Sequence, residues 1–485
     1  MSIKQRNLVI YILIAFTIIF CLFLDFNSYW YVILPFLTLI YIILKFWFVL
    51  WNRDKMVPLF EIGVVCMAAM AAYTLIPILS FLYTGGVYNP LSSLQLQALS
   101  PTFKEFGSFV WYYVVYVASF AVVYLPVRGH VSIREPKAFK IDPLTIKILI
   151  GIFIFMSIFF KFLQIYYGVN FYRSYDPTAL YSGLNAYLAL PHFYKQIVHN
   201  LFNIQLVTKM GLLAVLMAYW RKRKCRALLA LWLLAELVSY LFNMGARTYI
   251  ILMFMSSILL YHRLVNPFRT KVLIPVLVIL LIAFFLFGLL RGGPLSLQKR
   301  INEIASTEDF SFTTSNEFEA LLGGAYDLYY LKQNDLIQNV PWQIRIFEFL
   351  LLIPQQLLPF EKVNPQQWYL DLTAYPSYFM FNPVAQSIVG LGWIEIVMRG
   401  VFLGWLFARI HRWYVHKATS FWRTLFYLFL TVWSYYTIRS STFMFVYFVF
   451  YHFVPLMIVT VFVRELLNIK PQGTTLQKPA SSIIH

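Results

Sequence analysis

Long apolar runs alternate with short polar connections along most of this 485-residue chain. A run of about 20 apolar residues is long enough to cross the hydrocarbon core of a bilayer as an α-helix. The runs do not alternate apolar with polar positions, as the strands of a transmembrane barrel would, so they favour helices. The pattern therefore predicts an all-α polytopic membrane protein of about 12 transmembrane helices, near residues 8–24, 30–50, 58–83, 106–126, 145–166, 196–220, 227–244, 248–263, 272–290, 386–408, 420–437 and 442–463.

One connection is much longer than the others and lies between the ninth and tenth predicted spans. Loops of this length are usually functional or disordered, and this one is rich in aromatic and apolar residues, which favours a folded external cap. The expected organisation is therefore an N-terminal membrane region, the cap loop, a C-terminal membrane region and a flexible tail, at residues 1–290, 291–382, 383–465 and 466–485 respectively.

Within the cap, the apolar segment 344–360 is interrupted by Pro354 and Pro359. Proline breaks helical hydrogen bonding, and the segment is too short to cross a bilayer. We expect a re-entrant or an interfacial helix here, and the sequence leaves both open.

Composition supports the membrane assignment, since 60% of the residues are hydrophobic and only 12% are charged. The net charge of +19 does not indicate a nucleic-acid partner, because the cations form short clusters between the apolar runs, as topology signals and contacts for membrane lipids do. The three cysteines are widely separated, which predicts neither a disulfide framework nor a cysteine metal site.

The distribution of lysine and arginine predicts that both termini are cytoplasmic. With the N-terminus inside, the basic cluster 221–226 and the segment 409–417 face the cytoplasm, as the positive-inside rule requires. The first apolar run is followed by no small-residue cleavage site, so we expect an uncleaved helix. Charged residues within or near spans must pair, snorkel or face a cavity, and these are Lys45, Glu61, Lys161, Lys209, Glu236, Glu395 and Arg399.

Three arginines lie at the outward ends of predicted spans, against the topological bias: Arg247 in GARTY, Arg291 in LLRGGP and Arg439 in IRSST. A charge near a span centre costs about 2.5–3.5 kcal/mol of insertion free energy, and less near an end, so a functional partner is indicated. The expected partner is an anionic group, such as a phosphate, at the outer membrane surface. The alternative is that these side chains snorkel to lipid phosphates.

The cap contains candidates for the chemistry of a sugar substrate. Glu317 and Asp327 flank a Gly-Gly pair, and a carboxylate near an anionic substrate is expected to act as a base, bind a hydroxyl or pair with arginine. A plain salt bridge is the alternative for each. Tyr326, Trp368 and Tyr375 are candidates for stacking on sugar rings, although an interfacial aromatic belt explains them equally well.

Other cap residues and absent motifs limit the chemistry further. Arg300 and Arg345 are expected to neutralise cap carboxylates. No Walker loop, HExxH or DxD motif is present, so we expect no metal and no cofactor.

The chain resembles the Wzy family of O-antigen and capsular repeat-unit polymerases. The resemblance rests on many helices with one large external loop in the C-terminal half, on the GARTY turn, on Arg291 where that loop begins, and on TAYPSYFMFNPVAQSIVGLGWIEIVMRGVFLGWLF at 373–407. It covers most of the chain in layout, but its motifs are short.

The resemblance implies a glycosyltransferase of polysaccharide biosynthesis in the bacterial inner membrane. Such an enzyme transfers a growing glycan from undecaprenyl pyrophosphate to an incoming lipid-linked repeat unit at the outer face, as in lipopolysaccharide assembly. Arg247, Arg291 and Arg439 match the family's substrate-binding arginines, and a chain-length regulator protein is a possible partner. The alternatives are an O-antigen ligase-like or other lipid-phosphosugar transferase, and a flippase or transporter for lipid-linked oligosaccharide.

Overall fold

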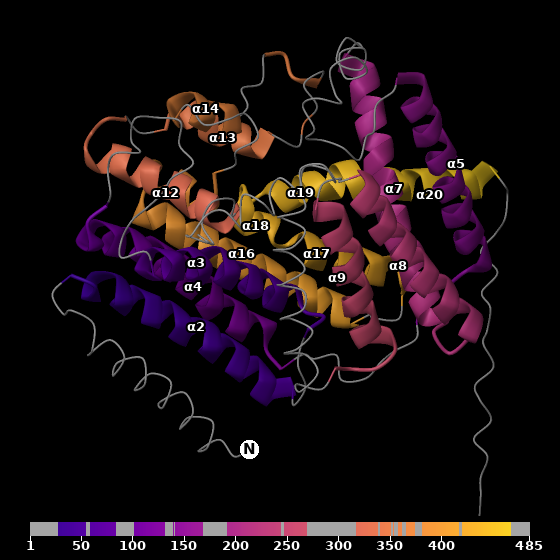
Figure 1. The fold of residues 1–485 in the computed structure, drawn as a ribbon, viewed down its shortest axis with the longest axis horizontal. Coiled ribbons are helices and arrows are strands. Elements are labelled where there is room, and N and C mark those ends of the chain that lie inside the picture. Colours follow the sequence, from indigo (N-terminus) through magenta and orange to yellow (C-terminus); the bar gives the residue numbers. More distant parts are fainter. Residues whose placement is uncertain are drawn as a thin grey trace, which may run out of the picture. The chain divides into compact units, whose positions relative to one another are not determined.

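The computed structural model describes residues 28–54, 59–83, 101–130, 139, 141–167, 192–243, 247–268, 317–337, 340–350, 353, 357–360, 365–373, 381–416 and 420–466. Every regular element in these ranges is a helix (Figure 1). The predicted spans 8–24 and 272–290, together with Arg291 and Tyr375, lie outside the described residues.

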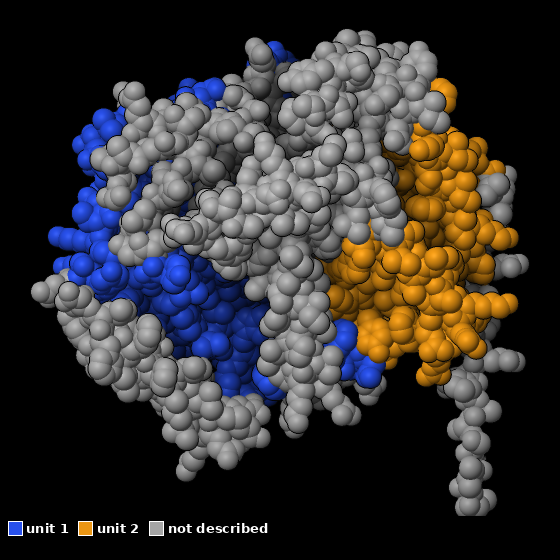
Figure 2. All heavy atoms as spheres, in the orientation of Figure 1, with its two compact units in different colours: residues 1–136, 266–416, 427–448 blue, residues 137–265, 417–426, 449–485 orange. Residues whose placement is uncertain are grey.

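The chain forms two compact units (Figure 2). The first comprises residues 1–136, 266–416 and 427–448. Its helices are α2 (Trp30–Asp54), α3 (Ile62–Tyr83), α4 (Phe103–Arg128), α12 (Glu317–Gln333), α13 (Trp342–Leu350), α14 (Pro365–Thr373), α15 (Pro383–Ile388), α16 (Trp393–His416), the second half of α17 (Phe421–Trp433), α18 (Tyr436–Arg439) and α19 (Met444–Phe448).

The second unit comprises residues 137–265, 417–426 and 449–485. Besides the first half of α17, its helices are α5 (Pro143–Tyr167), α7 (His192–Ala218), α8 (Arg223–Asn243), α9 (Arg247–Leu264), the π-helix η3 (Val449–Phe453) and α20 (Val454–Leu466). Within it, Lys209 of α7 and Glu236 of α8 form an ion pair of 2.6 Å, which is one of the ways we expected charges in spans to be satisfied.

Over the described residues, the structure confirms the predicted helical fold. Among the described residues, five helices are long and apolar enough to cross a bilayer: Trp30–Arg53, Ile62–Tyr83, Phe103–Arg128, Pro143–Phe162 and Met444–Leu466. Several more of the predicted spans coincide with helices, among them α7, α8 and α9. The total of twelve spans and the external position of the cap stay predictions.

The first unit is organised around α4, against which α2 and α16 pack lengthwise. Glycines permit the close approach. A Cβ atom at Gly400 of α16 would lie 2.8 Å from the Tyr116 carbonyl oxygen, and one at Gly404 would lie 2.5 Å from that of Phe120. Gly107 of α4 meets the backbone of Tyr31 on α2 in the same way. Small residues at four-residue spacing bring membrane helices into this kind of contact.

Both helices run in the same direction as α4. On α16, Trp393 stacks on Tyr112 near the start and Arg412 donates to the Val127 carbonyl near the end. Because the predicted topology gives these spans the same direction across the membrane, their parallel packing agrees with it.

The predicted span 386–408 is wrong at its start. The structure breaks it between α15, which ends at Ile388, and α16, which begins at Trp393 and continues to His416. Gly392 in the break has a φ of +62°, a left-handed conformation that glycine adopts without strain. The glycine-rich VGLG segment therefore forms a turn where the apolar pattern predicted continuous helix.

The predicted span 420–437 is also interrupted, whereas 442–463 corresponds to the continuous helical stretch Met444–Leu466, and the cap segment is shorter than a span. Residues 420–437 form α17 and the short α18, and residues 442–463 form α19, η3 and α20 in succession. In the cap, α13 has nine residues. At about 1.5 Å per residue it cannot cross about 30 Å of hydrocarbon, as expected.

Candidate functional site

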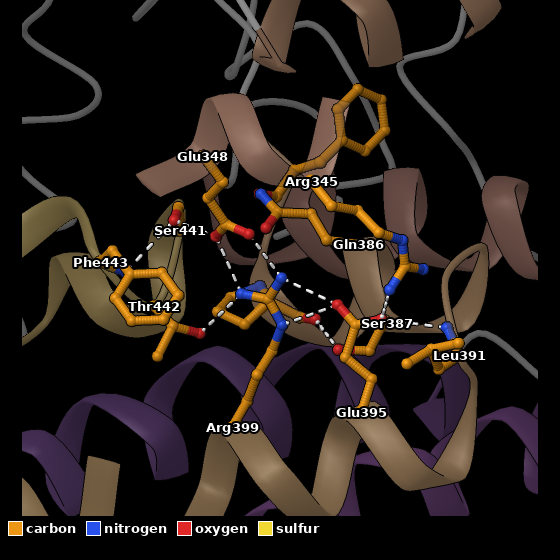
Figure 3. A network of polar contacts seen from close by, with 12 residues as sticks. Arg345, Glu348, Gln386, Ser387, Leu391, Glu395, Arg399, Ser441, Thr442 and Phe443 are labelled. Atoms are coloured by element: carbon orange, nitrogen blue, oxygen red, sulfur yellow. Dashed lines mark hydrogen bonds and ion pairs between the residues drawn. The ribbon is translucent and has the colours of Figure 1, made fainter. Parts of the chain in front are cut away.

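The first unit contains a buried network of charged groups between the start of α16, helix α13 and the turn that follows α18 (Figure 3). Glu395 and Arg399 lie one turn apart on α16, and Arg345 and Glu348 lie three residues apart on α13. Each helix thus offers one cation and one anion to the other. We call these four residues the charge quartet.

Arg399 is the centre of the charge quartet. A guanidinium group has five N–H donors. Its Nη1 donates to Glu348 Oε1 at 2.8 Å and to Thr442 Oγ1 at 3.0 Å, and its Nη2 donates to Glu348 Oε2 at 2.6 Å and to Glu395 Oε1 at 2.8 Å. Its Nε completes the set with a 3.0 Å bond to Glu395 Oε1. All five donors are therefore satisfied within the protein.

Glu348 is held as a buried carboxylate. Besides the bidentate pair with Arg399, it accepts a short hydrogen bond from the Ser441 hydroxyl. Burial raises the pKa of this carboxyl, but the charge and hydrogen bonds of Arg399 outweigh burial, and the pKa lies below its ordinary value of 4.5. Glu348 is therefore ionised at neutral pH and is a weak proton acceptor.

Glu395 occupies the first turn of α16, where the helix dipole favours a negative charge. Its Oε2 accepts from Arg345 Nη1 at 2.6 Å and from the backbone N–H of Leu391 at 3.0 Å. The carboxylate therefore fixes the glycine turn to the start of α16. Gly390 lies close to the Arg345 guanidinium and to this carboxylate. A Cβ atom at this position would lie 2.1 Å from Arg345 Nη2 and 2.2 Å from Glu395 Oε2.

Hydrogen bonds hold helix α15 in place next to the charge quartet. Asn382 caps α15 by accepting from the Ala385 N–H at 2.8 Å, and its side-chain amide donates to the Tyr113 hydroxyl of α4 at 2.7 Å. The Ser387 hydroxyl donates to the Pro383 carbonyl. Capping bonds of this kind hold the short helix beside the quartet.

The two arginines differ in exposure and in unused donors. The side chain of Arg399 is 11% exposed, whereas that of Arg345 is 26% exposed.

The quartet has no net charge, because two cations offset two anions. Buried charges that are paired in this way avoid the large cost of an isolated ion in a low-dielectric interior.

A second buried cluster lies at the other end of α4. Arg128 donates to both oxygens of Glu61 at 2.9 and 3.1 Å, and the Tyr124 hydroxyl donates to the same carboxylate at 2.5 Å. His411 of α16 lies 3.6 Å from Glu61 and 2.7 Å from the Tyr427 hydroxyl. This cluster joins the far ends of α3, α4 and α16.

Arg439 is the one predicted pyrophosphate-binding arginine whose side chain is described. Its Nη1 donates to the Tyr436 hydroxyl at 3.0 Å, and its guanidinium lies over the Tyr436 ring at 5.1 Å. Arg439 precedes Ser441 and Thr442, which contact Glu348 and Arg399. Arg247 begins α9, but the structure does not describe its side chain. The predicted convergence with Arg291 stays a prediction.

The other predicted site residues lie on cap helices. Asp327 and Tyr326 are buried on α12, and Tyr326 packs edge-on against Phe109 of α4. Trp368 of α14 meets the Tyr369 ring edge-on at 5.2 Å. Glu317 begins α12, and its side chain is not described. Their roles in catalysis and sugar binding stay predictions.

The sequence predicted that the charges of Glu395 and Arg399 must be paired or otherwise accommodated. In the structure Glu395 pairs with both arginines of the quartet, and Arg399 pairs with both carboxylates. It assigned Arg345 to cap carboxylates, but the structure pairs Arg345 with Glu395 of α16 instead. It gave Glu348 no role. The signal that could have found the site was an arginine within an apolar helix, since such a charge requires an acidic partner elsewhere in the chain.

The described residues contain no group of three His, Cys, Asp or Glu side chains arranged to hold a metal ion. The charge quartet consists of two guanidinium groups and two carboxylates joined by ion pairs. No family model matches the chain, and no curated protein and no solved structure matches it either.

Proposed function

We propose that this protein is a metal-independent membrane glycosyltransferase that polymerises lipid-pyrophosphate-linked oligosaccharide repeat units at the outer face of the bacterial inner membrane. The observation that best supports this proposal is the charge quartet. It places two guanidinium groups where helix α13 meets the first turn of α16, and next to the turn that follows Arg439.

The chemistry requires stabilisation of a leaving group. The bond between the anomeric carbon of the donor glycan and the pyrophosphate oxygen breaks, and a bond from that carbon to an acceptor hydroxyl forms. Negative charge then develops on the pyrophosphate, and preorganised guanidinium groups stabilise it more strongly in a partly dehydrated site than in water. In this proposal Arg247, Arg291 and Arg439 bind the pyrophosphate.

The acceptor hydroxyl must lose its proton as the new bond forms. A carboxylate of the cap takes that proton, and Glu317 and Asp327 are the candidates. Glu348 does not suit this role, because its lowered pKa and its bonds to Arg399 and Ser441 make it a poor base. We assign Glu348 and Arg399 to positioning the site instead.

The test uses purified protein and a synthetic oligosaccharide on undecaprenyl pyrophosphate. We expect a ladder of glycans of increasing length on the lipid carrier. Arg247→Lys, Arg291→Lys and Arg439→Lys should each shorten the ladder or reduce its yield, because lysine cannot form the paired hydrogen bonds of a guanidinium group. Arg409→Lys, on the exposed face of α16, is the matched control.

Three results would contradict the proposal in different ways. Normal ladders from all three variants would remove the arginine mechanism. Glycan found only on a different acceptor would indicate a ligase. Movement of the lipid-linked oligosaccharide across a vesicle membrane with no change in glycan length would indicate a flippase.

A further inference from the structure

Arg345 differs from Arg399 in the number of donors it uses. Within the described residues it donates a single hydrogen bond, from Nη1 to Glu395 Oε2. Since an arginine has five N–H donors, most of those on Arg345 remain available. Its side chain is also more than twice as exposed as that of Arg399, at 26% against 11%. Arg345 is therefore the cation of the quartet that an anionic ligand can reach.

Glu395 has hydrogen-bond partners besides Arg345. Arg399 contacts the carboxylate through both Nε and Nη2, and the Leu391 N–H donates to it as well. If Arg345 turned toward an anion, the buried carboxylate would keep three hydrogen bonds. Glu395 would still be paired with Arg399, which lowers the cost of releasing Arg345 to a ligand.

Exposed apolar residues follow the turn that contacts this guanidinium. The turn at Gly390 contacts Arg345 and is followed by Leu391, Trp393 and Ile394, whose exposed fractions are 61%, 43% and 66%. The Leu391 N–H and Arg345 bond to the same carboxylate oxygen, which fixes the cation and the apolar turn side by side. A cation next to exposed apolar residues suits a ligand with an anionic head and a hydrocarbon tail.

We propose that Arg345 binds the pyrophosphate of the polyprenyl carrier, with the hydrocarbon chain lying along Leu391, Trp393 and Ile394. This inference rests on the proposed function for the identity of the lipid. The exposed apolar surface continues along α16 through Val397 and Met398, whose exposed fractions are 40% and 61%, and a long polyprenyl chain can follow it. Arg345 thus adds a head-group contact to a site that Arg399 and Glu348 position.

The test measures binding of farnesyl pyrophosphate, a short single-chain analogue, to the full-length protein in detergent micelles. Farnesol, inorganic pyrophosphate and phosphatidylglycerol are the comparison ligands. We expect farnesyl pyrophosphate to bind most tightly, since it alone combines a pyrophosphate head with a hydrocarbon chain. Arg345→Gln should weaken its binding at least about ten-fold, in line with the loss of a hydrogen bond to a charged group.

Gly390→Ala supplies a second variant that keeps the arginine. The added Cβ meets the ends of the Arg345 and Glu395 side chains, which are flexible, so the protein should fold while the guanidinium is displaced. Binding should again weaken. The controls are Arg409→Gln, which removes an exposed arginine of α16, and Gly151→Ala, where a Cβ atom meets open space.

Four results would overturn the inference: unchanged affinity for farnesyl pyrophosphate in Arg345→Gln, equal binding of farnesol, equal binding of inorganic pyrophosphate, or equal or tighter binding of phosphatidylglycerol. Failure of the proposed function is distinguishable from each. If the wild-type protein binds farnesyl pyrophosphate through Arg345 but makes no glycan ladder, the lipid site stands and the polymerase assignment falls. If the wild-type protein makes a normal ladder but Arg345→Gln binds farnesyl pyrophosphate as tightly as wild type, the polymerase assignment stands and the lipid site at Arg345 falls.

Discussion

Replacing Arg399 with glutamine should destabilise the first unit more than any other single loss of an arginine on α16. The change removes five hydrogen bonds. Glu395 would keep Arg345 and the Leu391 N–H, whereas Glu348 would keep only the Ser441 hydroxyl among its described partners. The main loss of stability therefore comes from Glu348, a buried carboxylate with a side chain 9% exposed that would lose its cationic partner.

The magnitude follows from the cost of leaving a buried charge without its partner, which is about 3–5 kcal/mol. At about 2 °C per kcal/mol, the lower bound corresponds to a fall in Tm of about 6 °C. The double variant Glu348→Gln/Arg399→Gln should lose less stability than the sum of its single variants, because the second change removes the charge that the first left unpaired.

Thermal unfolding of the purified protein in one detergent provides the assay, with Arg409→Gln as control. Arg409 is exposed and lies over the Trp405 ring at 5.8 Å, an interaction of about 0.5–1 kcal/mol, so its loss should change Tm little. If Arg399→Gln unfolds within about 1 °C of that control, or if the double variant loses the full sum, the reasoning is wrong.

Further predictions concern packing, capping and pH. Gly404→Leu should destabilise the protein by about 1–3 kcal/mol or prevent folding, because even its Cβ would lie 2.5 Å from the Phe120 carbonyl oxygen; Gly151→Leu should not, and thermal unfolding compares them. Asn382→Ala should cost about 1–2 kcal/mol through the lost cap of α15, and wild-type Tm with this variant would refute the capping role. The folded-state pKa of Glu348 is lowered, so its stabilising contribution is present above pH 4.5 and is lost as pH falls through the lowered pKa. Acid should therefore lower the Tm of wild type more than that of Glu348→Gln, and parallel curves would contradict this.

The apolar pattern predicted several helices closely because hydrocarbon-length runs without charge have few alternative structures in a membrane protein. The predicted spans 30–50 and 145–166 correspond to Trp30–Asp54 and Pro143–Tyr167. The pattern failed at 386–408, because hydropathy alone does not register the turn between α15 and α16, in which Gly392 adopts a left-handed conformation.

The hydrophobic and charge pattern of the sequence could not predict which residues form the charge quartet. Glu348 and Arg399 are separated by 51 residues, so no local spacing connects them. The sequence could state that Arg399 needed an acidic partner, since an unpaired charge in an apolar helix is costly, but the choice among the many carboxylates depends on how the cap folds. It also favoured Glu317 and Asp327 for their position beside glycines, a criterion that does not detect ion pairs between distant helices.

The most direct test of the account is the length distribution of the glycan made by the purified protein from one lipid-pyrophosphate-linked oligosaccharide. The account predicts a ladder of whole repeat units on the carrier lipid, shortened or weakened by Arg439→Lys and unaffected by Arg409→Lys. A single unextended species after incubation with protein that binds the lipid would contradict the assignment of polymerase activity.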